Sequence, residues 1–114
     1  MFISYTLRDD EISIELLSSL KEILDKHEID SFIDVIDNNN INTEEHQKKI
    51  YNWILTATCL LLIETKETYN SPWVKKELDY ANSVNIPIMK MRFRDIKKLI
   101  MNPAKIKNIF LSIN

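Results

Sequence analysis

The sequence predicts an α/β fold, a doubly wound parallel sheet of four to five strands with helices on both faces. Short apolar runs alternate with longer segments whose apolar residues recur every three or four positions. The connections between them are short, which favours parallel strands joined by right-handed crossovers. Residues 59–63 are apolar throughout, as expected of a strand covered on both faces. The 114 residues suffice for one core, so we expect a single domain over residues 1–114.

The predicted elements alternate regularly along the chain. Strands are expected at residues 2–5, 31–35, 59–63 and 86–91, and a last strand or helical turn at residues 109–113. Helices are expected to begin near residues 10, 43, 72 and 95. Asp9 or Asp10 is the expected cap of the first helix, and Thr43 opens the second because two glutamates follow it.

The most informative segment is the start of the third predicted helix, which runs from Pro72 to about Val84. The Ser71 hydroxyl can accept from backbone N–H groups of the first turn, and Pro72 stands where its missing N–H costs nothing. Trp73 and Glu77 are four residues apart and therefore lie on one face of this helix. A carboxylate and an indole presented together beside a helix N-terminus suit a flat, cationic ligand.

The carboxyl ends of the strands are the expected place for a ligand on such a sheet. This rule gathers distant segments, namely Ser4, Tyr5 and Thr6 after the first strand, Asp34 after the second, Glu64 and Thr65 after the third, and the helix start from Ser71 to Glu77. Trp73 either packs on the sheet edge or faces the ligand. Asp34 either lines the pocket or bonds the backbone of the following loop. Tyr5 is a candidate ligand contact, whereas Phe2 belongs to the core by alternation.

The composition excludes several classes of protein. The chain has no glycine, so neither the G-x-G-x-x-G fingerprint nor a P-loop is present. The single cysteine, Cys59, cannot form an internal disulfide and is expected to be a small buried residue in a reducing compartment. His27 and His46 are expected at the surface, at a helix end and a helix start, so no metal site is predicted. Without a long apolar stretch or a signal peptide, we expect a cytoplasmic protein that does not enter a membrane.

Charge is distributed unevenly along the chain. Residues 1–46 carry 3 basic and 12 acidic side chains, residues 47–89 carry 5 and 4, and residues 90–114 carry 7 and 1. The basic residues of the last segment alternate with aliphatic ones and lack an aromatic platform beyond Phe93 and Phe110. This pattern favours a solvated helix face over a nucleic-acid surface. Electrostatic self-association with the acidic first segment is the second interpretation.

The sequence resembles Toll/interleukin-1 receptor (TIR) domains over nearly its whole length. The similar segments, in the family's order and spacing, are Phe2–Tyr5, Phe32–Val35, Tyr69–Trp73 with Glu77 and Leu78, and Ile86–Ile88. The resemblance implies a flavodoxin-like parallel sheet and a bacterial stand-alone TIR-like protein. One departure is the loop over residues 36–42, which contains neither the proline nor the glycine usual in the family.

The resemblance also implies a chemistry. Many TIR relatives cleave NAD at the nicotinamide–ribose bond, and others act only as signalling scaffolds. Glu77 falls on the family's catalytic glutamate, in a Trp-x-x-x-Glu spacing; taken alone, it would be an exposed helix glutamate. We therefore expect an NAD glycohydrolase or cyclase that releases nicotinamide and ADP-ribose or a cyclic relative. NAD is then the substrate, no cofactor is expected, and the substrate-binding candidates are Ser4, Tyr5, Thr6, Asp34, Ser71 and Trp73.

Partners and alternatives follow from the same resemblance. Self-association usually completes the pocket in TIR enzymes, and in bacterial relatives a nucleotide product activates an effector protein in antiviral defence. Neither a nucleic acid nor a membrane is expected as a partner. Two other functions stay open: a catalytically silent TIR scaffold, and a nucleoside deoxyribosyltransferase-like enzyme, which also places a carboxylate at a ribosyl carbon.

Overall fold

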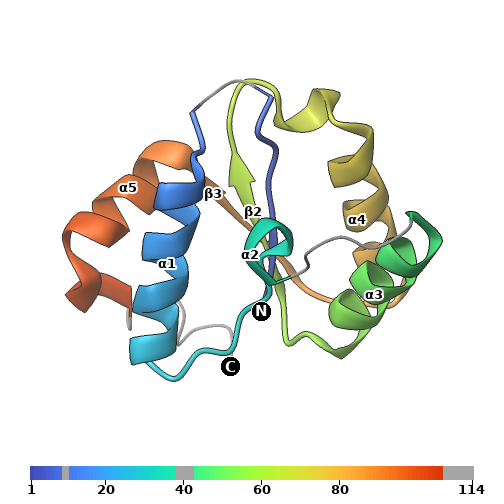
Figure 1. The fold of residues 1–114 in the computed structure, drawn as a ribbon, viewed down its shortest axis with the longest axis horizontal. Coiled ribbons are helices and arrows are strands. Elements are labelled where there is room, and N and C mark those ends of the chain that lie inside the picture. Colours follow the sequence, from blue (N-terminus) through green and yellow to red (C-terminus); the bar gives the residue numbers. More distant parts are fainter. Residues whose placement is uncertain (9–10, 38–42, 107–114) are drawn as a thin grey trace.

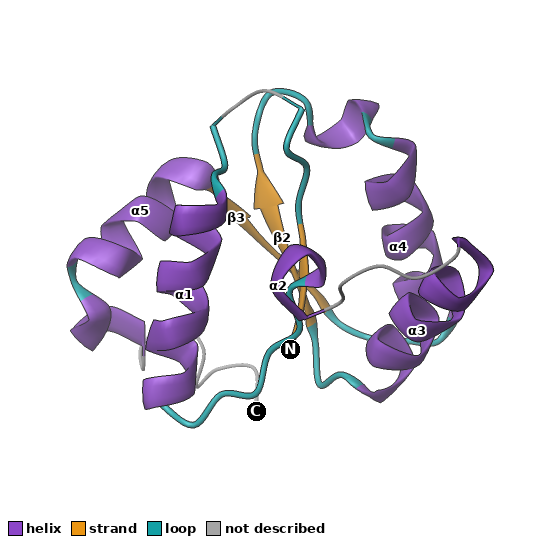
Figure 2. Cartoon of the chain, in the orientation of Figure 1, coloured by secondary structure: helices purple, strands orange, loops and turns teal. Residues whose placement is uncertain are grey.

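The computed structural model describes residues 1–8, 11–37 and 43–106 of the chain. A parallel sheet stands at its centre, with the strand order β1 (Phe2–Ser4), β2 (Leu60–Glu64) and β3 (Ile88–Arg92) (Figure 2). Phe32 forms an isolated parallel bridge on the other side of β1, because the Ile3 N–H donates to Phe32 while the Phe2 N–H donates to Cys59 next to β2. The order of segments therefore reverses at β1, which is where doubly wound folds bind ligands.

The helices form two layers on opposite faces of the sheet. One layer holds α1 (Ile14–Lys26) and α5 (Phe93–Met101), and the other holds α3 (Thr43–Thr56) and α4 (Pro72–Ser83) (Figure 1). The core divides accordingly. Leu61 and Ile63 of β2 pack in the cluster that includes α1 and α5, whereas Leu60 and Leu62 pack in the cluster that includes α3 and α4. Every one of these β2 side chains is fully buried, which confirms a strand covered on both faces.

The parallel sheet with helices on both faces is confirmed, but the prediction of four to five strands is not, since the sheet of the described residues has three. The expected strand at residues 31–35 is wrong apart from the bridge at Phe32. The chain instead turns into α2 (Asp34–Asp37). The cause is a contact with a distant segment: the Val35 N–H donates to the Tyr5 hydroxyl at 2.9 Å, so it does not continue a strand ladder.

Other boundaries also differ from the predictions. The cap of α1 is Ser13, whose hydroxyl accepts from the Leu16 N–H at 3.1 Å, and not Asp9 or Asp10, which lie outside the described residues. β3 begins after Pro87, whose carbonyl still accepts from the Leu60 N–H at 2.8 Å. The expected starts of α3 and α4 are confirmed. The predictions for the loop at residues 38–42 and for residues 109–113 lie outside the described residues.

A chain without glycine must end its helices in another way. After α1 and α4, the residues Glu28 and Asn85 take φ angles of 57° and 61°, in the left-handed region. In both places the following N–H returns to the helix: Ile29 donates to Leu24 at 2.9 Å, and Ile86 donates to Ala81 at 2.9 Å. This is the Schellman pattern, which usually has glycine at the left-handed position. Asparagine tolerates that conformation better than glutamate does.

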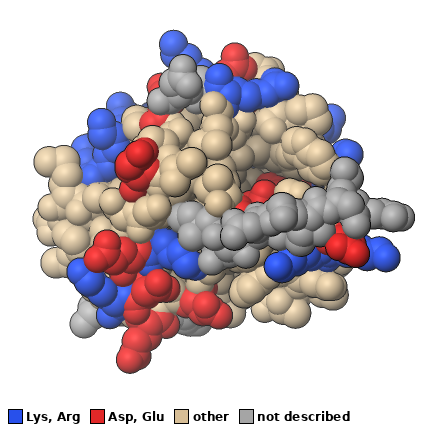
Figure 3. Space-filling model, in the orientation of Figure 1, with Lys and Arg blue, Asp and Glu red and all other residues tan. Residues whose placement is uncertain are grey.

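Some of the acidic side chains of the N-terminal segment gather on one side of the molecule (Figure 3). Acidic side chains gather at the lower left of Figure 3, in the region where Figure 1 draws α1, with Lys and Arg side chains close to them. The two helices of this layer, α1 and α5, pack against each other. Acidic and basic side chains of the described residues are therefore neighbours within this layer (Figure 3). Among the helices of the described residues, none combines the length and hydropathy of a membrane-spanning segment.

Candidate functional site

A cleft of about 490 Å³ opens beside the carboxyl end of β1, on the face that carries α3 and α4. Its walls come from the segment after β1, from α2, from the first half of α3 and from the start of α4. The lining residues are Ile3, Tyr5, Thr6, Leu7, Asp34, Val35, His46, Gln47, Ile50, Ser71, Trp73 and Glu77. None of these described lining residues is Lys or Arg, so the cleft favours a cationic group over an anionic one.

Glu77 lies in the second turn of α4 and is directed toward the end of β1. The Ser4 hydroxyl donates to Glu77 Oε1 at 2.7 Å. Ser4 itself is buried as the last residue of β1. This contact joins two positions that are 73 residues apart in the sequence, so β1 and α4 together fix the carboxylate at the cleft.

The environment of Glu77 shifts its protonation equilibrium. Burial raises the pKa of this carboxyl from 4.5 to about 7, the Ser4 hydrogen bond partly opposes that rise, and the negative charge of Asp34 adds to it. The carboxyl groups of Glu77 and Asp34 therefore interact electrostatically within the cleft. A carboxyl poised near neutral pH in a cleft is a frequent property of functional sites.

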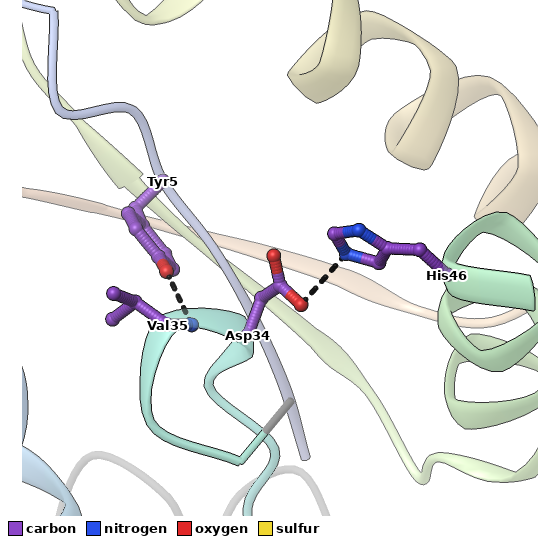
Figure 4. Close-up of polar contacts among 4 residues, drawn as sticks. All are labelled: Tyr5, Asp34, Val35 and His46. Carbon is purple, nitrogen blue, oxygen red and sulfur yellow. Dashed lines mark hydrogen bonds and ion pairs between the residues drawn. The ribbon is translucent and has the colours of Figure 1, made fainter. Parts of the chain in front are cut away.

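Asp34 and His46 form a polar pair in the same cleft (Figure 4). His46 Nε2 lies 2.9 Å from Asp34 Oδ1, and the two side chains are 39% and 32% exposed. Asp34 begins α2, and His46 lies in the first turn of α3. Tyr5 anchors this corner, because its hydroxyl accepts from the N–H of Val35, the residue after Asp34.

Trp73, Thr6 and Ser71 complete the lining of the cleft. Trp73 is 54% exposed, and Lys76 Nζ lies 4.9 Å from the centre of its ring, so the indole is at the surface and not in the core. Thr6 and Ser71 are buried, and their hydroxyls accept hydrogen bonds from backbone N–H groups. The Thr6 hydroxyl accepts from the Arg8 N–H at 3.3 Å, and the Ser71 hydroxyl accepts from the Val74 N–H at 3.4 Å as the cap of α4.

The structure brings together the predicted site residues. One cleft is lined by Tyr5, Thr6, Asp34, Ser71, Trp73 and Glu77. The Ser4 hydroxyl donates to Glu77 and so contacts the cleft through it. Glu64 and Thr65, which the strand-end rule grouped with them, line a separate hollow with Arg92 and Arg94. The strand-end rule does not distinguish the two faces of a sheet. The hollow with Glu64 and Thr65 includes Phe93, which packs in the cluster of α1 and α5 and not on the side of α3 and α4.

Sequence reasoning missed His46 and Gln47 as cleft residues. His46 was expected only as a surface residue at a helix start, yet it pairs with Asp34 and lines the cleft. A signal was present in the sequence. The first turn of a helix that follows the second β segment of such a fold starts at the carboxyl edge of the sheet, where ligands bind.

The chain matches one family model, described as "Thoeris protein ThsB, TIR-like domain", over residues 2–98. No curated protein and no solved structure matches the chain significantly. The matched range runs from β1 into α5 and so includes every residue of the cleft. The resemblance to TIR domains is confirmed, and the chain belongs to the family of TIR-like domains of Thoeris protein ThsB.

Proposed function

We propose that this protein is an NAD glycohydrolase or cyclase, which cleaves the nicotinamide–ribose bond of NAD. The observation that carries the proposal is Glu77, a carboxyl held by Ser4 in a cleft whose described lining residues include no Lys or Arg. Its Trp-x-x-x-Glu spacing is that of the catalytic glutamate in TIR enzymes. The products are nicotinamide and ADP-ribose or a cyclic ADP-ribose-type molecule.

The bond is a reasonable target for a site of this kind. Nicotinamide in NAD is already a cationic leaving group, so no general acid is needed to expel it. The ribosyl carbon acquires positive charge as the bond lengthens, and a fixed carboxylate stabilises that charge. Loss of one such group costs roughly a thousandfold in rate, or about 4 kcal/mol.

Protonation of Glu77 fits this role. At neutral pH the carboxyl is near the midpoint of its titration, since burial and Asp34 raise its pKa to about 7. Arrival of a cationic nicotinamide riboside lowers that pKa, because an opposite charge nearby favours the ionised form. Substrate binding thereby produces the carboxylate that the reaction uses.

The remaining expectations belong to the same proposal. We infer from the ThsB family relationship that the protein acts in antiviral defence and that its product activates an effector protein. NAD is a substrate here and not a resident cofactor. Self-association through the TIR domain would complete or regulate the cleft. The candidate substrate contacts are Tyr5, Asp34 and Trp73, while Thr6 and Ser71 hold the surrounding backbone.

The test is incubation of the full chain with NAD and identification of products by mass. Release of nicotinamide by the wild type and its loss in Glu77→Gln is the expected result, because the amide keeps the shape without the charge. Asp79→Asn is the matched control: it removes one exposed carboxylate from the same helix and should leave turnover unchanged.

Other outcomes lead to the alternative functions. A folded wild type that releases no nicotinamide but self-associates would favour a silent TIR scaffold. Transfer of a deoxyribosyl group between free nucleosides would favour the deoxyribosyltransferase-like enzyme. Normal nicotinamide release by a folded Glu77→Gln variant would remove Glu77 from the chemistry.

A further inference from the structure

The pair formed by Asp34 and His46 has a geometry that the proposed cleavage by Glu77 does not use. We propose that His46, oriented by Asp34, accepts the proton of the hydroxyl that attacks the ribosyl cation. The inference rests on the proposed function and adds a second catalytic residue to it. It concerns the step after nicotinamide has left, whereas Glu77 acts while the bond breaks.

The contact defines which ring nitrogen is engaged. His46 Nε2 lies 2.9 Å from Asp34 Oδ1, so in the neutral ring Nε2 carries the hydrogen and Nδ1 carries the lone pair. An acidic partner on one nitrogen fixes the tautomer and stabilises the cation that forms when the other nitrogen takes a proton. Both side chains are about one-third exposed, so a water molecule can reach them from the cleft.

The other groups of the cleft are less suited to this task. Glu77 must stay an anion beside the ribosyl cation, and its Oε1 already accepts from Ser4. The Tyr5 hydroxyl accepts from the Val35 N–H, and the phenol is a weak base. Asp34 is the group that holds the imidazole. Histidine is also the residue type that ordinarily exchanges a proton near neutral pH.

The bond between C1′ and the nicotinamide nitrogen breaks, and its electron pair leaves with nicotinamide, which becomes neutral. The oxygen of water or of a ribose hydroxyl forms a bond to C1′. Its proton moves to His46 Nδ1, and the imidazolium, stabilised by Asp34, later returns the proton to solvent. No oxidant or reductant is required.

A reaction without this proton transfer offers an internal comparison. When isotopically labelled nicotinamide exchanges into NAD, the neutral pyridine nitrogen attacks C1′ and no proton has to be removed. Exchange therefore requires Glu77 but not a base. If His46 acts as proposed, its loss slows attack by hydroxyl groups and leaves exchange intact.

The experiment measures both reactions in the full chain. In His46→Gln we expect roughly a hundredfold loss in the formation of ADP-ribose or its cyclic relative, the range of general-base catalysis, with exchange of labelled nicotinamide within about twofold of the wild type. In His46→Ala, added imidazole should restore part of the lost ADP-ribose formation. Lys49→Gln, an exposed change on the same helix, is the control and should alter neither rate.

The outcomes separate this inference from the function on which it rests. Equal loss of both reactions in the two His46 variants, or unchanged formation of ADP-ribose and its cyclic relative, would overturn the proton-accepting role while nicotinamide release by the wild type upholds the function. A wild type that neither releases nor exchanges nicotinamide would overturn the proposed function, and the His46 step with it. Because His46 is partly exposed, its replacement should not prevent folding.

Discussion

Replacement of Glu77 by glutamine should stabilise the protein at neutral pH while it abolishes activity. In the folded chain, burial holds the pKa of Glu77 at about 7, compared with 4.5 for an unperturbed carboxyl. Between these values the folded state binds more protons than the unfolded state, so stability falls as the pH rises through that window. Glutamine does not titrate, and its side-chain oxygen can still accept from Ser4. The variant therefore avoids the cost of ionising a partly buried carboxyl.

The magnitude follows from the same values. The difference between 4.5 and about 7, at about 1.4 kcal/mol for each pH unit, corresponds to about 3 kcal/mol once both states are ionised. The advantage of Glu77→Gln should thus be below about 1 kcal/mol at pH 5 and about 3 kcal/mol at pH 8. At an unfolding entropy of about 2.1 cal/mol/K per residue, the larger value raises Tm by on the order of 10 °C.

Urea unfolding of both proteins at pH 5, 6, 7 and 8 measures this directly. Asp79→Asn, which removes the same charge from an exposed position of α4, should show no such growth with pH. A difference between Glu77→Gln and the wild type that stays constant over this range, or a variant that is less stable at pH 8, would refute the raised pKa of Glu77 in the folded protein. The data would also show that loss of turnover in the variant is not loss of folding.

Three further predictions concern activity, backbone and assembly. The value of kcat/KM for NAD should rise with pH through about 7, because the carboxylate form of Glu77 is the active one; a profile that is flat between pH 5.5 and 8.5 would contradict this. Glu28→Gly should stabilise the protein by about 1 kcal/mol in urea unfolding, because glycine adopts the positive φ of 57° without steric cost, and a destabilised variant would contradict it. Specific activity should rise with protein concentration and fall with salt, since exposed charges are screened within ~8 Å at physiological ionic strength. Changing Lys97 and Lys98 of α5 to glutamate should weaken that dependence, whereas activity that is constant across dilution and salt would show that one monomer holds a complete site.

Local sequence pattern was enough to predict several parts of this protein. The continuous apolar run before Glu64 predicted the buried strand β2, because only a strand covered on both faces needs apolar residues on each side. The Ser71–Pro72 pair predicted the start of α4, because capping involves only neighbouring residues. The absence of glycine excluded the phosphate-binding loops that require it. The grouping of Ser4 and Glu77 followed from the rule that carboxyl ends of parallel strands share one edge.

Other features depend on contacts between distant segments and could not be predicted from local pattern. Residues 31–35 have the composition of a strand, but the Val35 N–H is taken by Tyr5, and the chain forms α2 instead. His46 lines the cleft because the fold brings the start of α3 beside α2, where His46 Nε2 lies 2.9 Å from Asp34 Oδ1. The protonation of Glu77 likewise depends on burial and on neighbours from β1 and α2, none of which lies within its own helix. Helix and strand propensity depends on adjacent residues, whereas the electrostatic environment of a side chain depends on segments that meet only when the chain has folded.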